Sequence, residues 1–418
     1  MSFIKDGVLS MKRLLSIICI LSLLTACNAS SKLDFLKADY LTSAEFASSK
    51  QLKQDIVMQN KQLKMPKKAN VAGFALSKDS VFYVLDYAHL FVDQTNSGKV
   101  PKFIKEYQTS IRAYNLSTEE EKEIFRFSNA DYKEISDLQV VGDYLFFVDY
   151  KDNYLNHDGR LANWQFNLLD LRTHEVKRIL EKELQKFSQY SFSVEARNAK
   201  LILSVEDFSG KDKHSFVYDV VNTKFKEVKE AKDIQQISSD GLKFTWQTKP
   251  QTKLKVANNS GLIVEASELN VQTKKTKQLK VLLPSPIINP VFNEQYLVYA
   301  ESRDFKDHLY ALDYVNGKLL NIKAASIDAN ESKKRNYFSD YELVGNKLLA
   351  IQTNSIYLYD LTTQTCQLIL DADLEGVSLH ELQRSDDTFC VRYTNNCERA
   401  DKTKTAASLG FYTFKIGH

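Results

Sequence analysis

The feature that most constrains this chain is a β-hairpin unit that recurs along most of its length. In the clearest copy, residues 341–352, two apolar runs flank the turn Gly345-Asn346. Short turns of Gly, Asn and Asp suit tight hairpins because their central residues adopt positive φ angles. Seven such hairpins are predicted, with turns at Lys78-Asp79, Gly142-Asp143, Asn198-Ala199, Asp240-Gly241, Asn293-Glu294, Gly345-Asn346 and near Asp386.

Each hairpin is followed by a third short strand that ends in a polar residue. The seven strand cores are residues 113–116, 168–171, 217–220, 268–271, 311–314, 358–361 and 413–416. Six of them carry Asp or Asn at the third position, as in Asp313 and Asp360, and the seventh carries Lys415. A short polar side chain there can accept backbone N–H groups, so we expect it to fix the following turn.

These third strands are apolar on both faces. In the sixth copy, Ile356 and Leu358 alternate with Tyr357 and Tyr359, whereas a half-exposed strand would alternate apolar with polar residues. A four-stranded repeat covered on both sides is typical of a propeller blade between its neighbours. The fold class is therefore predicted to be all-β, and the fold a β-propeller over residues 53–418.

The number of strands predicts how the ring closes. Seven hairpins and seven third strands are visible, but only six fourth strands, and the segment Asp55–Lys64 has strand character. Because an open blade edge is costly, we expect this N-terminal strand to close a seven-bladed ring. Six or eight blades would also fit, since residues 234–282 are poorly patterned in the middle.

Two segments carry a family resemblance. Residues Ser238–Phe244 (SSDGLKF) resemble the S-x-D-G hairpin of TolB-type and WD-repeat-like propellers. Residues Asp360–Thr363 and Asp313–Lys318 are similar to the D-L-x-T-G-K turn of the same broad group. The resemblance implies the propeller fold and an envelope setting, and it transfers no particular function.

The N-terminus predicts export and lipidation. Lys12 and Arg13 precede the apolar run Leu14–Leu24, which is too short to span a bilayer comfortably. The following Leu-Thr-Ala-Cys resembles the bacterial lipobox, whose cysteine becomes lipid-modified, here Cys27. The alternative is an ordinary buried helix that ends in cysteine. We therefore expect a signal peptide over 1–26 and a lipidated tether over 27–52, with the membrane contacted through the N-terminal lipid.

The resemblance also implies a location. In Gram-negative lipoproteins a residue other than Asp after the lipidated cysteine, here Asn28, directs the protein to the outer membrane, on its periplasmic face. In a Gram-positive host the anchor would remain on the extracytoplasmic face of the plasma membrane. An oxidising compartment permits disulfides, and Cys390 with Cys397 is the simplest pair among the mature cysteines.

Composition and motifs exclude several functions. The net charge of +3 gives no electrostatic case for nucleic-acid binding. The cysteines lack metal-ligand spacing, no cofactor motif is present, and no catalytic signature such as G-x-S-x-G or H-E-x-x-H occurs. We therefore expect a non-enzymatic protein-binding or scaffold module with an envelope protein partner.

The alternative is a site in the central channel, either of a polysaccharide-acting or lactonase-like enzyme or of a small-ligand sensor. Such a site would need three or more carboxylates or histidines converging on the axis from the first strands. The first-strand segments 71–76, 138–141, 234–237 and 290–292 are mostly apolar. The sequence therefore favours the scaffold over the channel site.

Candidate binding residues follow the second strands. Acid–aromatic pairs recur there, including Asp86-Tyr87 and Asp149-Tyr150, and they indicate either repeated turn chemistry or a contact surface on one rim. The loops 88–109, 151–163 and 394–408 are long and belong to neighbouring blades, so they could form one binding arc. Its expected anchors are the apolar Phe91 and Phe103 and the polar Tyr154, His157 and Arg160.

Overall fold

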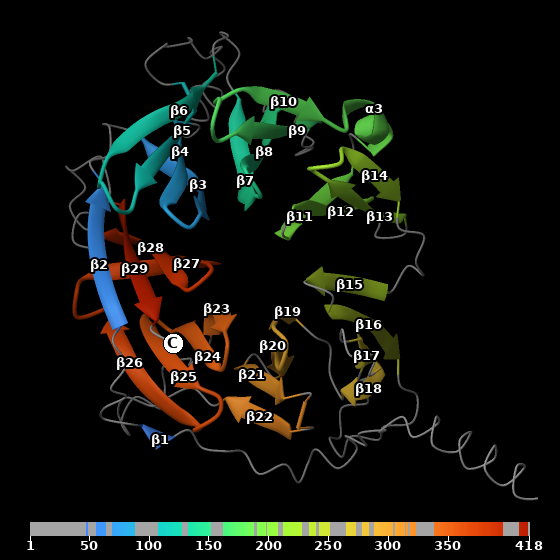
Figure 1. Cartoon of the computed structure of the whole chain (residues 1–418), viewed down its shortest axis with the longest axis vertical. Helices are drawn as coiled ribbons and strands as arrows, with labels where there is room; N and C mark the ends of the chain where they lie inside the picture. Colours follow the sequence, from blue (N-terminus) through green and yellow to red (C-terminus); the bar gives the residue numbers. More distant parts are fainter. Residues whose placement is uncertain are drawn as a thin grey trace, which may run out of the picture.

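The computed structural model of the chain describes residues 47–48, 56–63, 69–87, 108–127, 133–151, 162–187, 190–197, 199–207, 212–227, 234–239, 242–250, 265–272, 278–283, 288–303, 306–313, 315–316, 318–322, 338–395 and 409–416. The strands in these residues form seven sheets, antiparallel except for one short strand of the sixth, and they are numbered one to seven here in chain order. The sheets stand around a common centre, with the first strand of each sheet innermost (Figure 1). The prediction of an all-β propeller is confirmed.

The first three sheets run consecutively along the chain. Their strands are β3 (Asn70–Leu76), β4 (Ser80–Asp86), β5 (Ser110–Asn115) and β6 (Glu121–Arg126) in sheet one, β7 (Glu134–Val141), β8 (Tyr144–Lys151), β9 (Ala162–Asp170) and β10 (Val176–Ile179) in sheet two, and β11 (Ser191–Arg197), β12 (Lys200–Glu206), β13 (Lys213–Asp219) and β14 (Lys224–Glu227) in sheet three.

The next two sheets repeat the same order. Their strands are β15 (Ile234–Ser239), β16 (Leu242–Pro250), β17 (Glu265–Gln272) and β18 (Gln278–Leu283) in sheet four, and β19 (Ile288–Phe292), β20 (Tyr296–Arg303), β21 (Lys306–Asp313) and β22 (Lys318–Ile322) in sheet five.

Sheets six and seven each include a strand from the N-terminal part of the chain. Sheet six contains β23 (Phe338–Val344), β24 (Lys347–Gln352), β25 (Ser355–Asp360) and β26 (Thr365–Asp371), with the two-residue strand β1 (Ala47–Ser48) parallel to β26. Sheet seven contains β27 (Val377–Ser385), β28 (Thr388–Asn395) and β29 (Leu409–Ile416), with β2 (Ile56–Leu63) outermost.

The pairing of β2 with β29 joins the two ends of the propeller segment. The strands run antiparallel, from Ile56 opposite Ile416 to Leu63 opposite Leu409. Tyr393 on β28 donates its hydroxyl hydrogen bond to Asn60 Oδ1 at 2.7 Å. β2 therefore covers an edge of β29 that would otherwise expose unpaired backbone groups.

The predicted hairpins are confirmed in all seven sheets, because each first strand pairs antiparallel with the strand that follows it in the chain. The turn role of the third-strand acids is also confirmed. Asp360 accepts the backbone N–H groups of Thr362 and Thr363 at 2.9 and 3.0 Å. Asp170, Asp219 and Asp313 accept equivalent bonds from the residues that follow them.

The core lies between the sheets, as the two-faced apolar strands predict. Tyr357 and Tyr359 of β25 belong to a buried cluster shared with sheet five. Ile356 and Leu358, on the other face, belong to a cluster shared with sheet seven. All four side chains are at most 3% exposed. Sheet six is therefore held mainly by apolar burial against both of its neighbours.

Only short helices interrupt the sheets in the described residues. α3 (Glu181–Leu184) and the 3₁₀ turn η3 (Gln185–Phe187) connect β10 to β11. None of the helices described is long or apolar enough to cross a membrane. The predicted signal peptide and most of the tether lie outside the described residues.

A recurring irregularity marks the innermost strands. The pairing register shifts within β3, β7, β19, β23 and β27, at or near the same point of each strand. Asp137 and Asn289, at two of these shifts, have positive φ angles of 52° and 47°. Such bulges bend a strand and redirect its side chains, here at the centre of the ring.

Candidate functional site: the central channel

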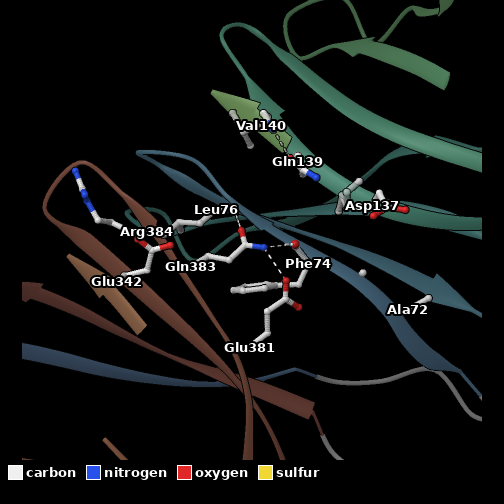
Figure 2. Close-up of a pocket in the computed structure, with 13 residues that line it drawn as sticks. Ala72, Phe74, Leu76, Asp137, Gln139, Val140, Glu342, Glu381, Gln383 and Arg384 are labelled. Carbon is white, nitrogen blue, oxygen red and sulfur yellow. Dashed lines mark hydrogen bonds between the residues drawn. The ribbon is translucent and has the colours of Figure 1, made fainter. Parts of the chain in front are cut away.

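Two adjoining cavities lie among the innermost strands. One has a volume of about 470 Å³ and is lined from β3, β7, β11, β23 and β27. The other, of about 520 Å³, is lined from β11, β19, β23 and β27 and from the β19–β20 turn. Ala196, Glu342 and Arg384 line both cavities, so the two cavities adjoin, and together they are called the central channel here. Figure 2 shows the first cavity.

The described lining is strongly acidic. Six carboxylate residues line the two cavities, and Arg384 is the one basic residue among the described lining. The six are Asp137, Glu195, Glu294, Asp340, Glu342 and Glu381. Six acids against one arginine give the lining an excess of acidic residues, whereas the whole chain has a net charge of +3. Negative charge is therefore concentrated at the axis.

The expectation that the first strands carry few acids is wrong. Asp137, Glu195 and Glu342 lie on innermost strands but outside the segments that suggested an apolar axis. At Asp137 a bulge is the physical reason, because it turns toward the channel a residue that regular alternation would place elsewhere. Glu195 lies on β11, whose pairing with β12 is regular, and it was missed because it lies outside the segments considered. A usable signal does exist in the sequence: a polar pair interrupts the strand at Ser136-Asp137 and at His380-Glu381.

Two glutamines tie the channel wall together. Gln383 on β27 donates Nε2 bonds to the Phe74 carbonyl at 2.7 Å and to Glu381 Oε1 at 2.8 Å (Figure 2). Its Oε1 accepts the Leu76 N–H at 2.9 Å. Gln139 on β7 makes the same two-sided contact with the backbone of β11. These amides join the first strands of neighbouring sheets, β27 to β3 and β7 to β11. They lie next to the bulges that shift the pairing of β27 and β7 with their own second strands.

Asp340 crosses from sheet six to sheet seven. Its Oδ2 accepts the Leu382 N–H at 2.8 Å, and its Oδ1 accepts the Tyr341 N–H at 2.9 Å. Burial raises the pKa of Asp340 to about 6, although these two N–H bonds favour the charged form. Tyr341 extends the wall in the other direction by donating to the Asn289 carbonyl at 2.6 Å.

Glu381 lies close to Asp340 at the axis. Burial raises its pKa, while the Gln383 amide and the Arg392 guanidinium lower it. Arg392 Nε lies 3.8 Å from Glu381 Oε2. The channel thus offers carboxyl groups of differing proton affinity, which can accept hydrogen bonds from amines or hydroxyls. No cluster of three or more His, Cys, Asp or Glu in the described residues could hold a metal ion.

The predicted acid–aromatic pair of sheet one is buried. Asp86 and Tyr87 are 7% and 5% exposed. Thr109 donates to Asp86 Oδ1 at 3.3 Å, which links the end of β4 to the approach to β5. These described contacts fit repeated turn chemistry, and neither side chain lines the channel.

The pair of sheet two is likewise held by internal contacts. Asp149 is 3% exposed. Its Oδ2 accepts a hydrogen bond from Asn167 Nδ2 at 2.8 Å, and its Oδ1 forms an ion pair with Lys133 Nζ at 2.8 Å. It also lines a cavity of about 230 Å³. Tyr150 donates to Glu134 Oε2 at 2.6 Å. The structure does not bring this pair into the central channel.

The other predicted site residues lie outside the described residues: Cys27, Phe91, Phe103, Tyr154, His157, Arg160 and Cys397. Cys390 is described as a free thiol that is fully buried on β28. Because its expected partner is not described, the Cys390–Cys397 disulfide stays a prediction, and it would require access to a sulfur packed inside the core.

The fold is similar to that of known propellers. The β-propeller domain of the trilobed protease from Pyrococcus furiosus, described with an open velcro topology, matches at 12% identity and a TM-score of 0.53, over 84% of this chain and 98% of that one. An uncharacterized protein from Listeria monocytogenes EGD-e matches at 13% identity and a TM-score of 0.48, over 84% and 96%. An acylaminoacyl peptidase from Pyrococcus horikoshii matches at 12% identity and a TM-score of 0.47, over 78% of this chain and 49% of that one.

At these identities the first likeness shows a β-propeller fold and nothing about activity. No protein-family model matches the chain, and no curated protein matches its sequence.

Proposed function

We propose that this protein is a lipid-anchored binding module of the bacterial envelope, with its ligand site in the central channel. In this proposal Cys27 carries the lipid, residues 27–52 form the tether, and seven blades form a ring that β2 closes. The lipobox-like N-terminus supports the anchor. The seven sheets and the pairing of β2 with β29 support the closed ring.

The acidic channel is the observation that carries the proposal. Carboxylates from several innermost strands face two adjoining cavities of about 470 and 520 Å³. Cavities of this size suit small ligands or single side chains. Because the described lining has six acids against one arginine, a ligand with amine groups fits best.

Binding, rather than turnover, is the proposed role. Asp340 and Glu381 are both engaged by neighbouring groups, namely main-chain N–H groups at Asp340 and the Gln383 amide at Glu381. The described lining holds no serine–histidine or cysteine–histidine pair, so a serine or cysteine nucleophile is not part of the proposal. A channel enzyme remains the alternative, and it would convert the ligand that the channel binds.

A protein partner would bind at the rim. Sheets seven, one and two are neighbours, since β27 contacts β3 and β3 contacts β7. The long connections β28–β29, β4–β5 and β8–β9 therefore belong to three adjacent sheets. Deleting residues 93–103 should leave the fold intact and abolish partner capture in a crosslinking pull-down. Unchanged capture would exclude this rim.

The channel site can be tested with a polyamine. Purified full-length protein in lipid nanodiscs should bind spermidine, measured by calorimetry, and spermidine should raise its melting temperature. The double variant Glu195→Gln with Glu342→Gln should weaken binding by about tenfold, because two ligand-facing charges are lost. The exposed Glu375→Gln is the matched control and should bind normally.

Equal binding by the double variant and the control would exclude the channel. Conversion of the bound ligand, detected by mass spectrometry, would instead identify an enzyme. The anchor is tested separately: the Cys27→Ser variant should leave the membrane fraction, and its retention there would contradict lipidation at Cys27.

A further inference from the structure

A second pocket lies away from the channel, beside the short helix between sheets two and three. Its volume is about 330 Å³. Its apolar lining comes from β9, from β10 and the residue that follows it, and from α3, and it consists of Trp164, Phe166, Ile179, Leu180 and Leu184. All five side chains are buried. The pocket is therefore built into the packed region of sheet two.

Aromatic stacking and a tight corner hold this pocket in shape. The Trp164 and Phe166 rings stack with centroids 4.9 Å apart, and Phe192 of β11 packs on Trp164 at 5.0 Å. Leu180 has a left-handed backbone, with φ of 58° and ψ of 21°. This conformation is rare for a bulky residue, and it turns the chain from β10 directly into α3, where Leu184 is buried in the same cluster.

The indole N–H of Trp164 lacks a hydrogen-bond partner within the described part of the chain. Trp164 is only 7% exposed, so this donor is also shielded from solvent. A buried donor without an acceptor is costly, and tryptophan N–H groups usually find a partner when they are buried. A ligand that brings an acceptor into the pocket would satisfy this donor.

The mouth of the pocket is basic. Arg178, Lys182 and Glu181 line its edge and are exposed. Arg178 Nη1 lies 3.9 Å from Glu181 Oε1, a separation at which an exposed pair gains little. Two cations against one carboxylate leave an excess positive charge at the entrance, which favours an anionic group on the ligand.

We propose that this pocket binds a small aromatic carboxylic acid. The ring would occupy the apolar interior against Trp164 and Phe166. One oxygen of the carboxylate would accept the Trp164 N–H, and the other would lie toward Arg178 and Lys182. This inference is independent of the channel ligand and of the lipid anchor.

The probe is 2-naphthoate, with the neutral 2-naphthamide as its matched comparison. Because the chain has two tryptophans, the Trp246→Phe variant leaves Trp164 as the sole indole reporter. In nanodisc-held full-length protein of this variant, 2-naphthoate should change the Trp164 emission saturably. Calorimetry should show the acid binding at least about fivefold more tightly than the amide, because only the acid meets the basic mouth.

Three variants locate the site by calorimetry. Trp164→Phe keeps the ring but removes the N–H, and it should weaken 2-naphthoate binding by about fivefold. Lys182→Gln should reduce the preference for the acid over the amide. Lys224→Gln, on the exposed strand β14, is the control and should change nothing. Melting curves verify that each variant is folded.

Absence of saturable binding at millimolar probe would overturn the proposal. Equal affinity for the acid and the amide would overturn the anionic preference. Normal 2-naphthoate binding by a folded Trp164→Phe variant would overturn the role of the indole N–H.

Discussion

Acidic residues serve two different purposes in this propeller, and the comparison separates scaffold from site. Asp170, Asp219 and Asp360 are the last residues of their third strands and recur with the blades. Backbone N–H groups bind these carboxylates and lower the pKa of Asp170 and Asp219. At Asp360, burial acts in the opposite direction, but the Lys347 ammonium and the N–H groups of Thr362 and Thr363 lower the pKa overall.

Two of the channel acids, Asp340 and Glu381, behave in the opposite way. Burial raises the pKa of Asp340 to about 6 and also raises that of Glu381. They belong to strand irregularities and side-chain contacts that differ from sheet to sheet. An acid that repeats with the blade therefore stabilises a turn, whereas Asp340 and Glu381, at strand irregularities, have pKa values that burial raises.

The largest expected effect comes from removing a turn acid that is also paired. Asp360 is 4% exposed and accepts bonds from Asn346 Nδ2, Lys347 Nζ and two backbone N–H groups. Asp360→Ala should lower the free energy of unfolding by about 3 kcal/mol, because it leaves the half-buried Lys347 unpaired. Urea denaturation measures this.

Asp313→Ala is the matched control for that prediction. Asp313 is also buried, and its carboxylate accepts hydrogen bonds from Val315, Asn316 and Gln295, none of which is charged. Its loss should cost about 1–2 kcal/mol, the value of neutral hydrogen bonds. If the two variants were equally destabilised, the paired charge would contribute nothing at Asp360.

The next effect concerns pH. Because the pKa of Asp340 is raised in the folded protein to about 6, the folded state binds more protons than the unfolded state between about pH 4 and pH 6. Its contribution to stability is present below pH 4 and is lost as pH rises through 6.

Asp340→Asn should remove this dependence. Relative to the variant, the native protein should lose about 1–2 kcal/mol of stability between pH 4 and pH 7, measured by urea denaturation at each pH. A constant difference across this range would show that Asp340 has an ordinary pKa and that the two classes of acid do not differ.

A smaller loss of stability is expected from removing Gln383 or Gln139, whose side-chain amides join neighbouring first strands. Gln383→Ala removes contacts with the Phe74 carbonyl and the Leu76 N–H, and should cost about 1–2 kcal/mol. Gln139→Ala should cost a similar amount, because it makes the same contact between β7 and β11. The exposed Gln185→Ala should be neutral. A neutral result for both ties would show that the channel wall is held by apolar packing alone.

The smallest expected effect is the failure of two thiols to react. Burial raises the pKa of Cys366 to about 12 and raises that of Cys390 well above its ordinary range. Iodoacetamide at pH 8 should therefore leave both unmodified in the folded protein and modify both in urea, as read by peptide mass spectrometry. Rapid labelling of Cys390 in the folded state would show that this region of sheet seven opens.

Particular residues show which features the sequence pattern could predict and which it could not. Asp360 and Asp313 were assigned to turns because six copies share the position, and the structure confirms this. The acidic channel was not predicted because its acids do not recur at one position of every first strand. Asp137 and Glu381 lie at bulges, and a bulge reverses the alternation from which side-chain direction is inferred.

The sequence by itself determined the all-β repeat, the seven hairpin positions, the turn acids and the packing of β25 on both faces. Local turn chemistry and strand periodicity are encoded within a few consecutive residues, which is why they could be predicted. Only the tertiary structure decided which acids meet at the axis and how the Trp164 pocket forms. The channel depends on side chains from strands far apart in the chain, whereas the Trp164 pocket depends on how the consecutive elements β9, β10 and α3 pack together. The burial of these side chains exists only once the sheets pack around a common centre.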